Sequence, residues 1–149
     1  MTVIEIPVTK TSTPAYKEEE MTEYDEHWMT TYTGKRFHFL NPGPDEICIE
    51  DIAHHLSLIC RFTGACKVFY SVAEHCIRVA HLVPWDLKLA ALLHDGSEAY
   101  INDISRPVKY SHKLQKTEHK ILEVIGSKFR VNLFHSTIKK ADDILLATE

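Results

Sequence analysis

The sequence lacks the features that mark secreted, membrane-spanning and nucleic-acid-binding proteins. Its four cysteines are irregularly spaced and form no Cys-x-x-Cys pair, and no charged tip followed by an apolar block opens the chain. No apolar run approaches the roughly 20 residues that span a bilayer. A net charge of -4 gives no general attraction to phosphate backbones. We therefore expect a soluble, cytoplasmic protein with reduced, mostly buried cysteines and no stable nucleic-acid or membrane partner.

What the sequence does contain is enough apolar material for one folded domain. Hydrophobic residues make up 44% of the 149 residues, which suffices for a single core without disulfides. Residues 1–23 include the polar run Lys17–Glu20 and are expected to form a flexible arm. Residues 24–149 are expected to form the single domain. No internal repeat is visible.

The spacing of apolar residues predicts an all-α fold with a short N-terminal β-hairpin. Two β-prone segments flank Gly34 between Trp28 and Leu40, which suits a hairpin. From about residue 50 onward, apolar residues recur at helical spacing, with a loop at residues 102–107. The predicted helices cover residues 50–62, 72–83, 86–100 and 111–129 and a last segment from residue 136.

Two of these helices begin with recognisable capping residues. Ser71 and Glu74 form a capping box, in which the serine accepts from the third helical amide and the glutamate reaches back. Asp86 is placed to cap the third helix. The capping box puts His75 in the first turn of its helix.

A polar and acidic cluster interrupts the apolar pattern of the third predicted helix. His94 and Asp95 are adjacent and project about 100 degrees apart, so both can reach one ion between their faces. Glu98 lies one turn later on the same side. A histidine nitrogen and a carboxylate oxygen suit a borderline divalent metal, but two protein ligands rarely hold one tightly. His75 and Asp142, each on an otherwise apolar helix, are the best-placed further ligands.

Several short pieces spread over residues 61–142 carry a resemblance to a known superfamily. They are Arg61-Phe62, Ala73-Glu74-His75, His94-Asp95-Gly96-Ser97-Glu98, Asp103-Ile104-Ser105-Arg106-Pro107-Val108-Lys109 and Lys140-Ala141-Asp142. The order His, His-Asp, Asp resembles the HD-domain phosphohydrolases, whose four metal ligands come from separate helices of one bundle. Within that superfamily, the pieces look like the bacterial 5′-deoxynucleotidases.

The hairpin region from Trp28 to Pro42 and the small size look closer still to phage-type HD hydrolases, which include dATP triphosphohydrolases. Two features depart from the deoxynucleotidases. Phe62 stands where they carry tryptophan, and their further C-terminal helices are missing. Both departures concern the substrate and not the metal site.

The resemblance implies an HD-type helical bundle with His75, His94, Asp95 and Asp142 as metal ligands. The ion would be cobalt, manganese, zinc or iron, since a mixed histidine and carboxylate site accepts all of them. Such an ion lowers the pKa of a water and withdraws charge from phosphorus. The resemblance further implies a homo-oligomer in the cytoplasm, which is the host cytoplasm if a phage encodes the chain.

The same resemblance gives five other residues a role. Glu98 and Asp103 would be catalytic, by positioning water or moving a proton. Arg61 would hold phosphate through its planar fork, Lys109 would add a point charge, and Trp28 would stack on a base. Each has a structural alternative: Arg61 as a helix-end charge, Asp103 as a turn residue, Lys109 as a solvated lysine and Trp28 as a hairpin anchor.

The favoured function is hydrolysis of a deoxynucleotide, with dATP giving deoxyadenosine and triphosphate. The alternatives are a 5′-deoxynucleotidase acting on deoxynucleoside monophosphates and a non-catalytic nucleotide-binding HD module. Signalling-nucleotide hydrolases of the superfamily are disfavoured. Ala99 follows Glu98 where guanosine-tetraphosphate hydrolases have aspartate, and the Gly-Tyr-Pro extension of cyclic-dinucleotide enzymes is missing.

Overall fold

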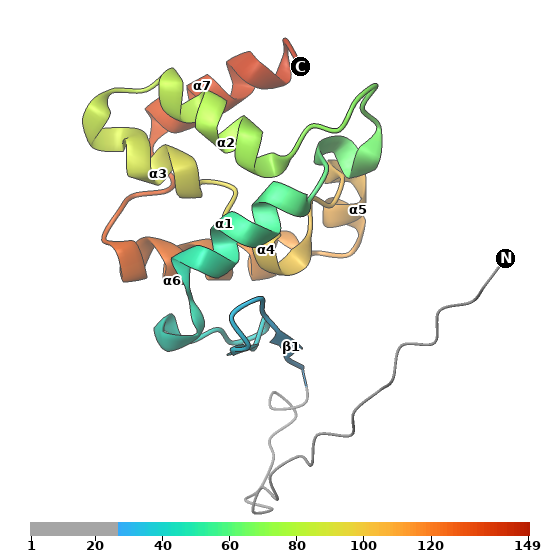
Figure 1. Ribbon diagram of the computed structural model, residues 1–149, viewed down its shortest axis with the longest axis vertical. Coiled ribbons are helices and arrows are strands. Elements are labelled where there is room, and N and C mark those ends of the chain that lie inside the picture. The colour runs from blue at the N-terminus through green and yellow to red at the C-terminus, as the bar shows by residue number, and fades with distance from the viewer. Residues whose placement is uncertain (1–26) are drawn as a thin grey trace, which may run out of the picture.

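The structure, a computed structural model, describes residues 27–149, and these residues are mostly helical (Figure 1). The predicted all-α fold with a short hairpin is confirmed. The predicted arm over residues 1–23 lies outside the described residues. The helices are α1 (Ile49–Leu58), α2 (Val72–His81), α3 (Lys88–Leu93), α4 (Glu98–Ile101), α5 (Arg106–Ser111), α6 (Gln115–Phe129) and α7 (Ser136–Leu146), with 3-10 turns η1 (Pro44–Glu46), η2 (Arg61–Gly64) and η3 (Trp85–Leu87).

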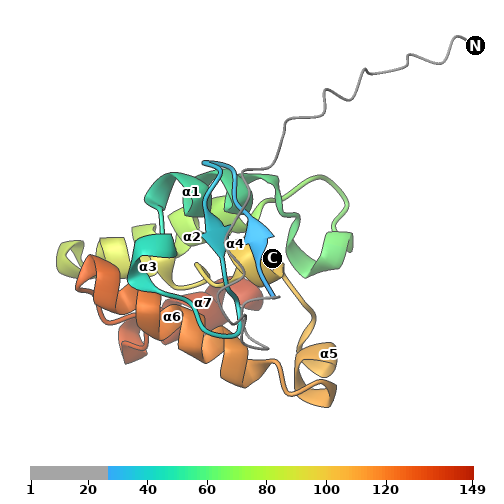
Figure 2. The ribbon, with the colours of Figure 1, turned by 90° about the horizontal axis from the view of Figure 1, so that it is seen from below.

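The hairpin is antiparallel and is attached to α1 and α4 by side chains. Met29 lies opposite Phe37 in the register. The Phe37 ring, which is fully buried, stacks on Tyr100 of α4 with ring centroids 3.7 Å apart. Thr33 donates to the Asp51 carboxylate of α1 from its amide at 2.7 Å and from its hydroxyl at 2.9 Å. Figure 2 shows the hairpin over these two helices. The strands are β1 (Met29–Thr30) and β2 (Arg36–Phe37).

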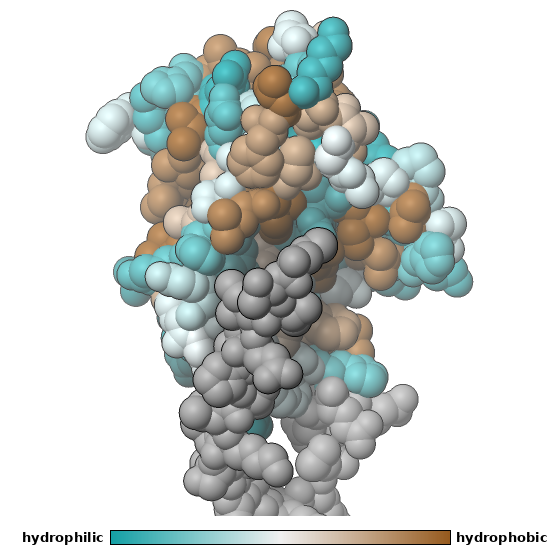
Figure 3. Space-filling view, turned by 45° about the vertical axis from the view of Figure 1, so that its right-hand side comes forward, coloured by the Kyte–Doolittle hydropathy of each residue, from teal (hydrophilic) through white to brown (hydrophobic). Residues whose placement is uncertain are grey.

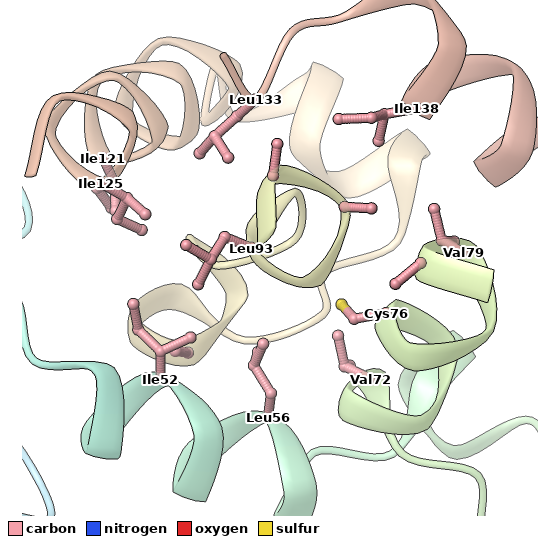
Figure 4. Packing of buried hydrophobic residues seen from close by; sticks show 14 of the residues in the cluster. Ile52, Leu56, Val72, Cys76, Val79, Leu93, Ile121, Ile125, Leu133 and Ile138 are labelled. Atoms are coloured by element: carbon pink, nitrogen blue, oxygen red, sulfur yellow. The ribbon is translucent and has the colours of Figure 1, made fainter. Parts of the chain in front are cut away.

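Helix α2 packs against α1, α3 and α7. Figure 1 shows α7 and the hairpin at opposite ends of the molecule. In the core, Leu93 of α3 lies between Ile52 of α1 and the pair Ile121 and Ile125 of α6 (Figure 4). All four side chains are at most 2% exposed. Burial of such side chains supplies the main stabilisation of the bundle.

The predicted helix over residues 86–100 is broken into two helices, which corrects the sequence analysis. Helix α3 ends at Leu93 and α4 begins at Glu98. Between them the chain makes tight turns of the i to i+3 type, such as Glu98 N–H to the Asp95 carbonyl at 2.9 Å. Asp86 does not cap α3, because it lies inside η3 and the N-cap position is Leu87.

Two further boundaries differ from the prediction because of local backbone conformation. The expected loop at residues 102–107 already contains the start of α5, where Pro107 occupies the first helical turn that tolerates proline. The helix expected from residue 111 begins at Gln115 as α6, because Lys113 adopts a φ of +57° that interrupts the helix. Helix α1 ends at Leu58 and not near residue 62.

The four cysteines form no disulfide with one another. Only Cys76 is buried, so the expectation that most of them are buried is wrong. The half-buried cysteines are Cys48, Cys60 and Cys66.

Large hydrophobic side chains also remain on the surface. Trp85 is 85% exposed and Val68 is 77% exposed. The face drawn in Figure 3 shows hydrophobic side chains in brown between hydrophilic ones in teal. Among residues 27–149, no helix has both the length and the apolar character that crossing a membrane requires.

We expect Gly96→Ala to destabilise the fold at the break between α3 and α4. A Cβ atom at Gly96 would lie 2.9 Å from the Leu93 carbonyl oxygen and 3.1 Å from Ile125 Cδ1. Overpacking of this kind costs about 1–3 kcal/mol, which urea denaturation followed by circular dichroism measures. Gly43→Ala is the matched control. A Cβ atom at Gly43 would have only atoms of the flexible Glu46 side chain nearby, at 3.7 Å or more. Equal stability of the two variants would contradict the steric argument.

Candidate metal centre

Helix α2 presents His75 from its capped first turn. The Ser71 hydroxyl accepts from the Glu74 amide at 3.1 Å, which confirms the serine half of the capping box. The glutamate half differs, because the Glu74 carboxylate pairs with Arg78 at 2.6 Å along the helix surface. His75 is 0% exposed, so its ring points into the protein.

The break after α3 and the packing of α7 bring three more predicted ligands to His75. His75 Nε2 lies 3.2 Å from Asp142 Oδ1 and 3.6 Å from Asp95 Oδ2. His94 Nε2 lies 3.4 Å from Asp95 Oδ1 and 4.0 Å from Asp142 Oδ1. The structure thus brings His75, His94, Asp95 and Asp142 together between α2, the turn after α3, and α7.

This arrangement can hold a metal ion. Ligand atoms of His75, His94 and Asp95 all lie within 4.8 Å of one another. The Nδ1 atoms of both rings face oxygen acceptors. His94 Nδ1 lies 2.7 Å from the Ala91 carbonyl oxygen, and His75 Nδ1 lies 3.0 Å from Glu149 Oε1. Both Nε2 atoms are buried, and neither has a hydrogen-bond partner among the described residues. Two histidine nitrogens and two carboxylates that face one another form a set of ligands that a divalent ion can bind.

His75 and Asp142 of the cluster shift one another's pKa values toward the charged forms. Desolvation by itself would lower the pKa of His75, but the carboxylates of Asp142 and Glu149 outweigh it, and the pKa is raised. Desolvation would raise the pKa of Asp142, but the attraction of His75, His94 and Lys139 outweighs it, and the pKa is lowered. The pocket therefore favours a positive charge between its carboxylates.

Arg61 lies at the edge of the cluster and is only 6% exposed. Its Nη1 is 3.3 Å from Asp95 Oδ2, and its Nε is 3.3 Å from Glu149 Oε2. Desolvation would lower the pKa of Arg61, but the carboxylates of Asp95 and Glu149 raise it. A buried guanidinium is chemically suited to anchor an oxyanion, here next to a carboxylate that could hold a metal ion.

Glu98 is a buried carboxyl beside the cluster. Its side chain accepts from Lys109 Nζ at 3.3 Å through Oε1, and Lys109 also pairs with Glu118 at 2.6 Å. The other oxygen, Oε2, is buried without a hydrogen-bond partner among residues 27–149. Desolvation, with repulsion from Asp95 and Asp103, raises the pKa of Glu98 to about 9. At neutral pH this carboxyl is protonated and can donate a proton.

Asp103 holds the loop that carries Arg61. Its Oδ2 accepts the Phe62 amide at 2.8 Å, and its carbonyl accepts the Thr63 hydroxyl at 3.3 Å. Phe62 and Thr63 adopt φ values of +55° and +54°, a conformation that costs free energy in non-glycine residues and occurs most often at functional sites. Asp103 therefore has a structural task in addition to its predicted catalytic one.

Trp28, the predicted base-stacking residue, lies elsewhere, immediately before β1. The guanidinium of Arg36 lies over its ring at 4.5 Å from the centroid. This contact lies within the hairpin, and Trp28 is 40% exposed, so it does not show the alternative role of anchoring the hairpin to the core.

Three residues at the site were missed by the sequence analysis. Glu149 contacts His75 and Arg61, Tyr70 donates to the Glu149 carboxylate, and Glu118 pairs with Lys109. None of the three belongs to a motif, so the sequence gives no signal for them. Glu149 lies 74 positions from His75, whereas Glu118 lies nine positions from Lys109.

The comparisons with known proteins show the family of this chain. No protein-family model matches it. It is 43% identical over 124 residues to the uncharacterized protein YfdR of Escherichia coli (strain K12). The aligned residues make up 82% of this chain and 70% of YfdR. An uncharacterized protein of Rhodobacter capsulatus is 40% identical over 93 residues, 55% of this chain and 46% of that protein. The chain belongs to the YfdR family.

We expect Glu98→Gln to stabilise the metal-free protein increasingly as pH rises. The pKa of Glu98 is about 9 in the folded state and 4.5 ordinarily, so its contribution to stability is complete below about pH 4.5 and is lost as pH rises toward 9. Glutamine lacks this loss. The stability difference from wild type should grow by up to about 1.4 kcal/mol per pH unit, as measured by urea denaturation at several pH values.

Glu123→Gln provides the control, since this carboxylate on α6 is 59% exposed. Its stability difference from wild type should stay nearly constant with pH. A constant difference for Glu98→Gln as well would show that Glu98 is ionised in the folded protein.

Proposed function

We propose that the protein is a divalent-metal-dependent phosphohydrolase of the HD-domain type that acts on deoxynucleotides. The observation that carries the proposal is the pair of buried, unpartnered Nε2 atoms of His75 and His94, which face the carboxylates of Asp95 and Asp142. These four residues stand in the order, and on the separate helices or helix ends, that the resemblance implies. A bound ion would give both nitrogens a partner.

The four residues would hold one cobalt, manganese, zinc or iron ion. When bound, the ion would supply Lewis acidity, which makes a water a better nucleophile and withdraws charge from phosphorus. The chain itself supplies the groups that bind the substrate and move protons.

Space for a small molecule lies next to three residues that neighbour the cluster or Arg61. Cavities of about 640, 530 and 520 Å³ are lined by Glu98, Glu149 and Asp103, respectively. These volumes lie in the range of small-molecule sites. Arg61 would hold a phosphate oxygen beside them. The choice of a deoxynucleotide, and of dATP first, comes from the resemblance to phage enzymes.

The same bond would be cleaved in dATP and in a deoxynucleoside monophosphate. Water attacks the α-phosphorus, the bond from phosphorus to the 5′ oxygen breaks, and that oxygen takes up a proton. From dATP the products are deoxyadenosine and triphosphate, and from a monophosphate they are the deoxynucleoside and phosphate. Protonated Glu98 is the donor that the leaving oxygen needs, and the attacking water loses its proton to a carboxylate such as Asp103.

The proposal predicts metal-dependent turnover in a panel of deoxy- and ribonucleoside mono- and triphosphates with Co²⁺, Mn²⁺, Zn²⁺ or Fe²⁺. Chromatography should show deoxyadenosine and intact triphosphate from dATP. Phosphate released from monophosphates alone would favour the 5′-deoxynucleotidase. Absence of turnover in a folded, metal-loaded protein would contradict the enzyme proposal and favour the non-catalytic binding module.

Two variants separate metal binding from chemistry in the same panel. Asp95→Asn should weaken metal binding and turnover together, because it removes a ligand charge. Glu98→Gln should keep metal binding and lose roughly 10²–10⁴-fold in kcat, the contribution of general acid catalysis. The exposed Glu123→Gln should leave both unchanged. Full activity of Glu98→Gln would remove Glu98 from the mechanism.

Arg61→Lys tests the phosphate anchor. Lysine keeps the charge but cannot present the planar fork, so we expect KM to rise about tenfold or more, equivalent to about 1.4 kcal/mol or more, with a smaller change in kcat. Arg130→Lys, at an exposed position after α6, is the matched control. Steady-state kinetics with the best substrate provides the measurement, and an unchanged KM would refute the anchor role.

A further inference from the structure

The orientation of the His75 ring depends on a residue that lies 74 positions away in the chain. Its Nδ1 lies 3.0 Å from Glu149 Oε1, while its Nε2 lies 3.2 Å from Asp142 Oδ1. An ionised carboxylate only accepts hydrogen bonds, so the proton of that contact belongs to Nδ1. In the neutral ring the lone pair is then on Nε2, which faces the ligand cluster.

The Glu149 carboxylate is itself held from several sides. Tyr70 donates its hydroxyl to Oε1, and Arg61 Nε lies 3.3 Å from Oε2. The side chain is only 8% exposed, although the residue's backbone is open to solvent. A carboxylate that is buried to this extent and contacts three polar side chains has a defined position.

His94 shows the same device built from the backbone. Its Nδ1 lies 2.7 Å from the Ala91 carbonyl, which can only accept, so Nδ1 carries the proton and Nε2 faces the cluster. The two rings thus present the same nitrogen inward, one oriented by its own helix and the other by Glu149. Only the second orienting contact can be removed by a side-chain substitution.

We propose that Glu149 is a positioning residue of the metal centre, whose carboxylate accepts the His75 Nδ1 proton and fixes Nε2 toward the ion. This inference rests on the proposed metal centre. Partners of this kind select the tautomer of a ligand histidine and raise its basicity, and their loss lowers metal affinity roughly 10–100-fold. Helix α7 and the residues after it would then supply both a ligand, Asp142, and the support for another.

The test is titration of the full-length, metal-free protein with Co²⁺, followed by visible absorption and calorimetry. We expect Glu149→Ala to weaken Co²⁺ binding roughly 10–100-fold and to change the absorption spectrum of the bound ion. Glu149→Gln, which keeps a neutral acceptor and is the safer variant for folding, should weaken binding less and change the spectrum in the same direction. Tyr70→Phe, which loosens the carboxylate, should have a smaller effect. Glu123→Gln serves as the control.

The spectrum separates positioning from general destabilisation. If Glu149 only stabilised the fold, its variants would have lower melting temperatures but the bound ion would absorb as in the wild type. Wild-type affinity and an unchanged spectrum in Glu149→Gln and Glu149→Ala would overturn the inference and leave the metal centre intact. Failure of the wild-type protein itself to bind Co²⁺, Mn²⁺ or Zn²⁺ would overturn the metal centre and this inference with it.

Discussion

Two imidazole nitrogens and two carboxylates converge in a largely buried space between α2, the turn after α3, and α7, and this convergence constrains the rest of the site. Carboxylates repel one another and repel nitrogen lone pairs, most strongly where water is scarce. A positive charge among them is therefore favourable, and the pKa of His75 is raised by the carboxylates of Asp142 and Glu149 despite its desolvation. A divalent ion bound there would attract both carboxylates and accept the lone pairs of both nitrogens.

The fold meets this constraint by interrupting a helix. His94 and Asp95 lie in the tight turns between Leu93 and Glu98, which replace the continuous helix expected over residues 86–100. Both contact residues of α2 or α7 from these turns, and Glu98 is buried at the start of α4. The break is possible because no side chain at Gly96 obstructs the approach of α6.

The sequence predicted the elements and the composition of the cluster better than its surroundings. Apolar spacing identifies helices, because this signal is local. The residue types and the resemblance predicted that His75, His94, Asp95 and Asp142 form a candidate metal site, and the structure brings these four residues together. The break at residues 94–97 was missed, since Leu92 and Ala99 continue the helical pattern on either side. Glu149 was missed for a different reason: it contacts His75 through tertiary packing alone, which leaves no trace in spacing. Glu118 was missed because its contact with Lys109 joins the consecutive helices α5 and α6 and belongs to no motif.

The position of Arg61 links metal binding to substrate binding in the proposed enzyme. In the structure its guanidinium is shared between Asp95 and Glu149, each at 3.3 Å. A phosphate that approaches Arg61 therefore meets two carboxylates as well as one cation, and their repulsion opposes binding. In the proposed enzyme, an ion held by Asp95 would neutralise that carboxylate and leave the guanidinium free to pair with phosphate. Glu149 meanwhile stays engaged with His75 and Tyr70. In the proposed enzyme, the bound ion would thus also help Arg61 to hold the substrate's charge.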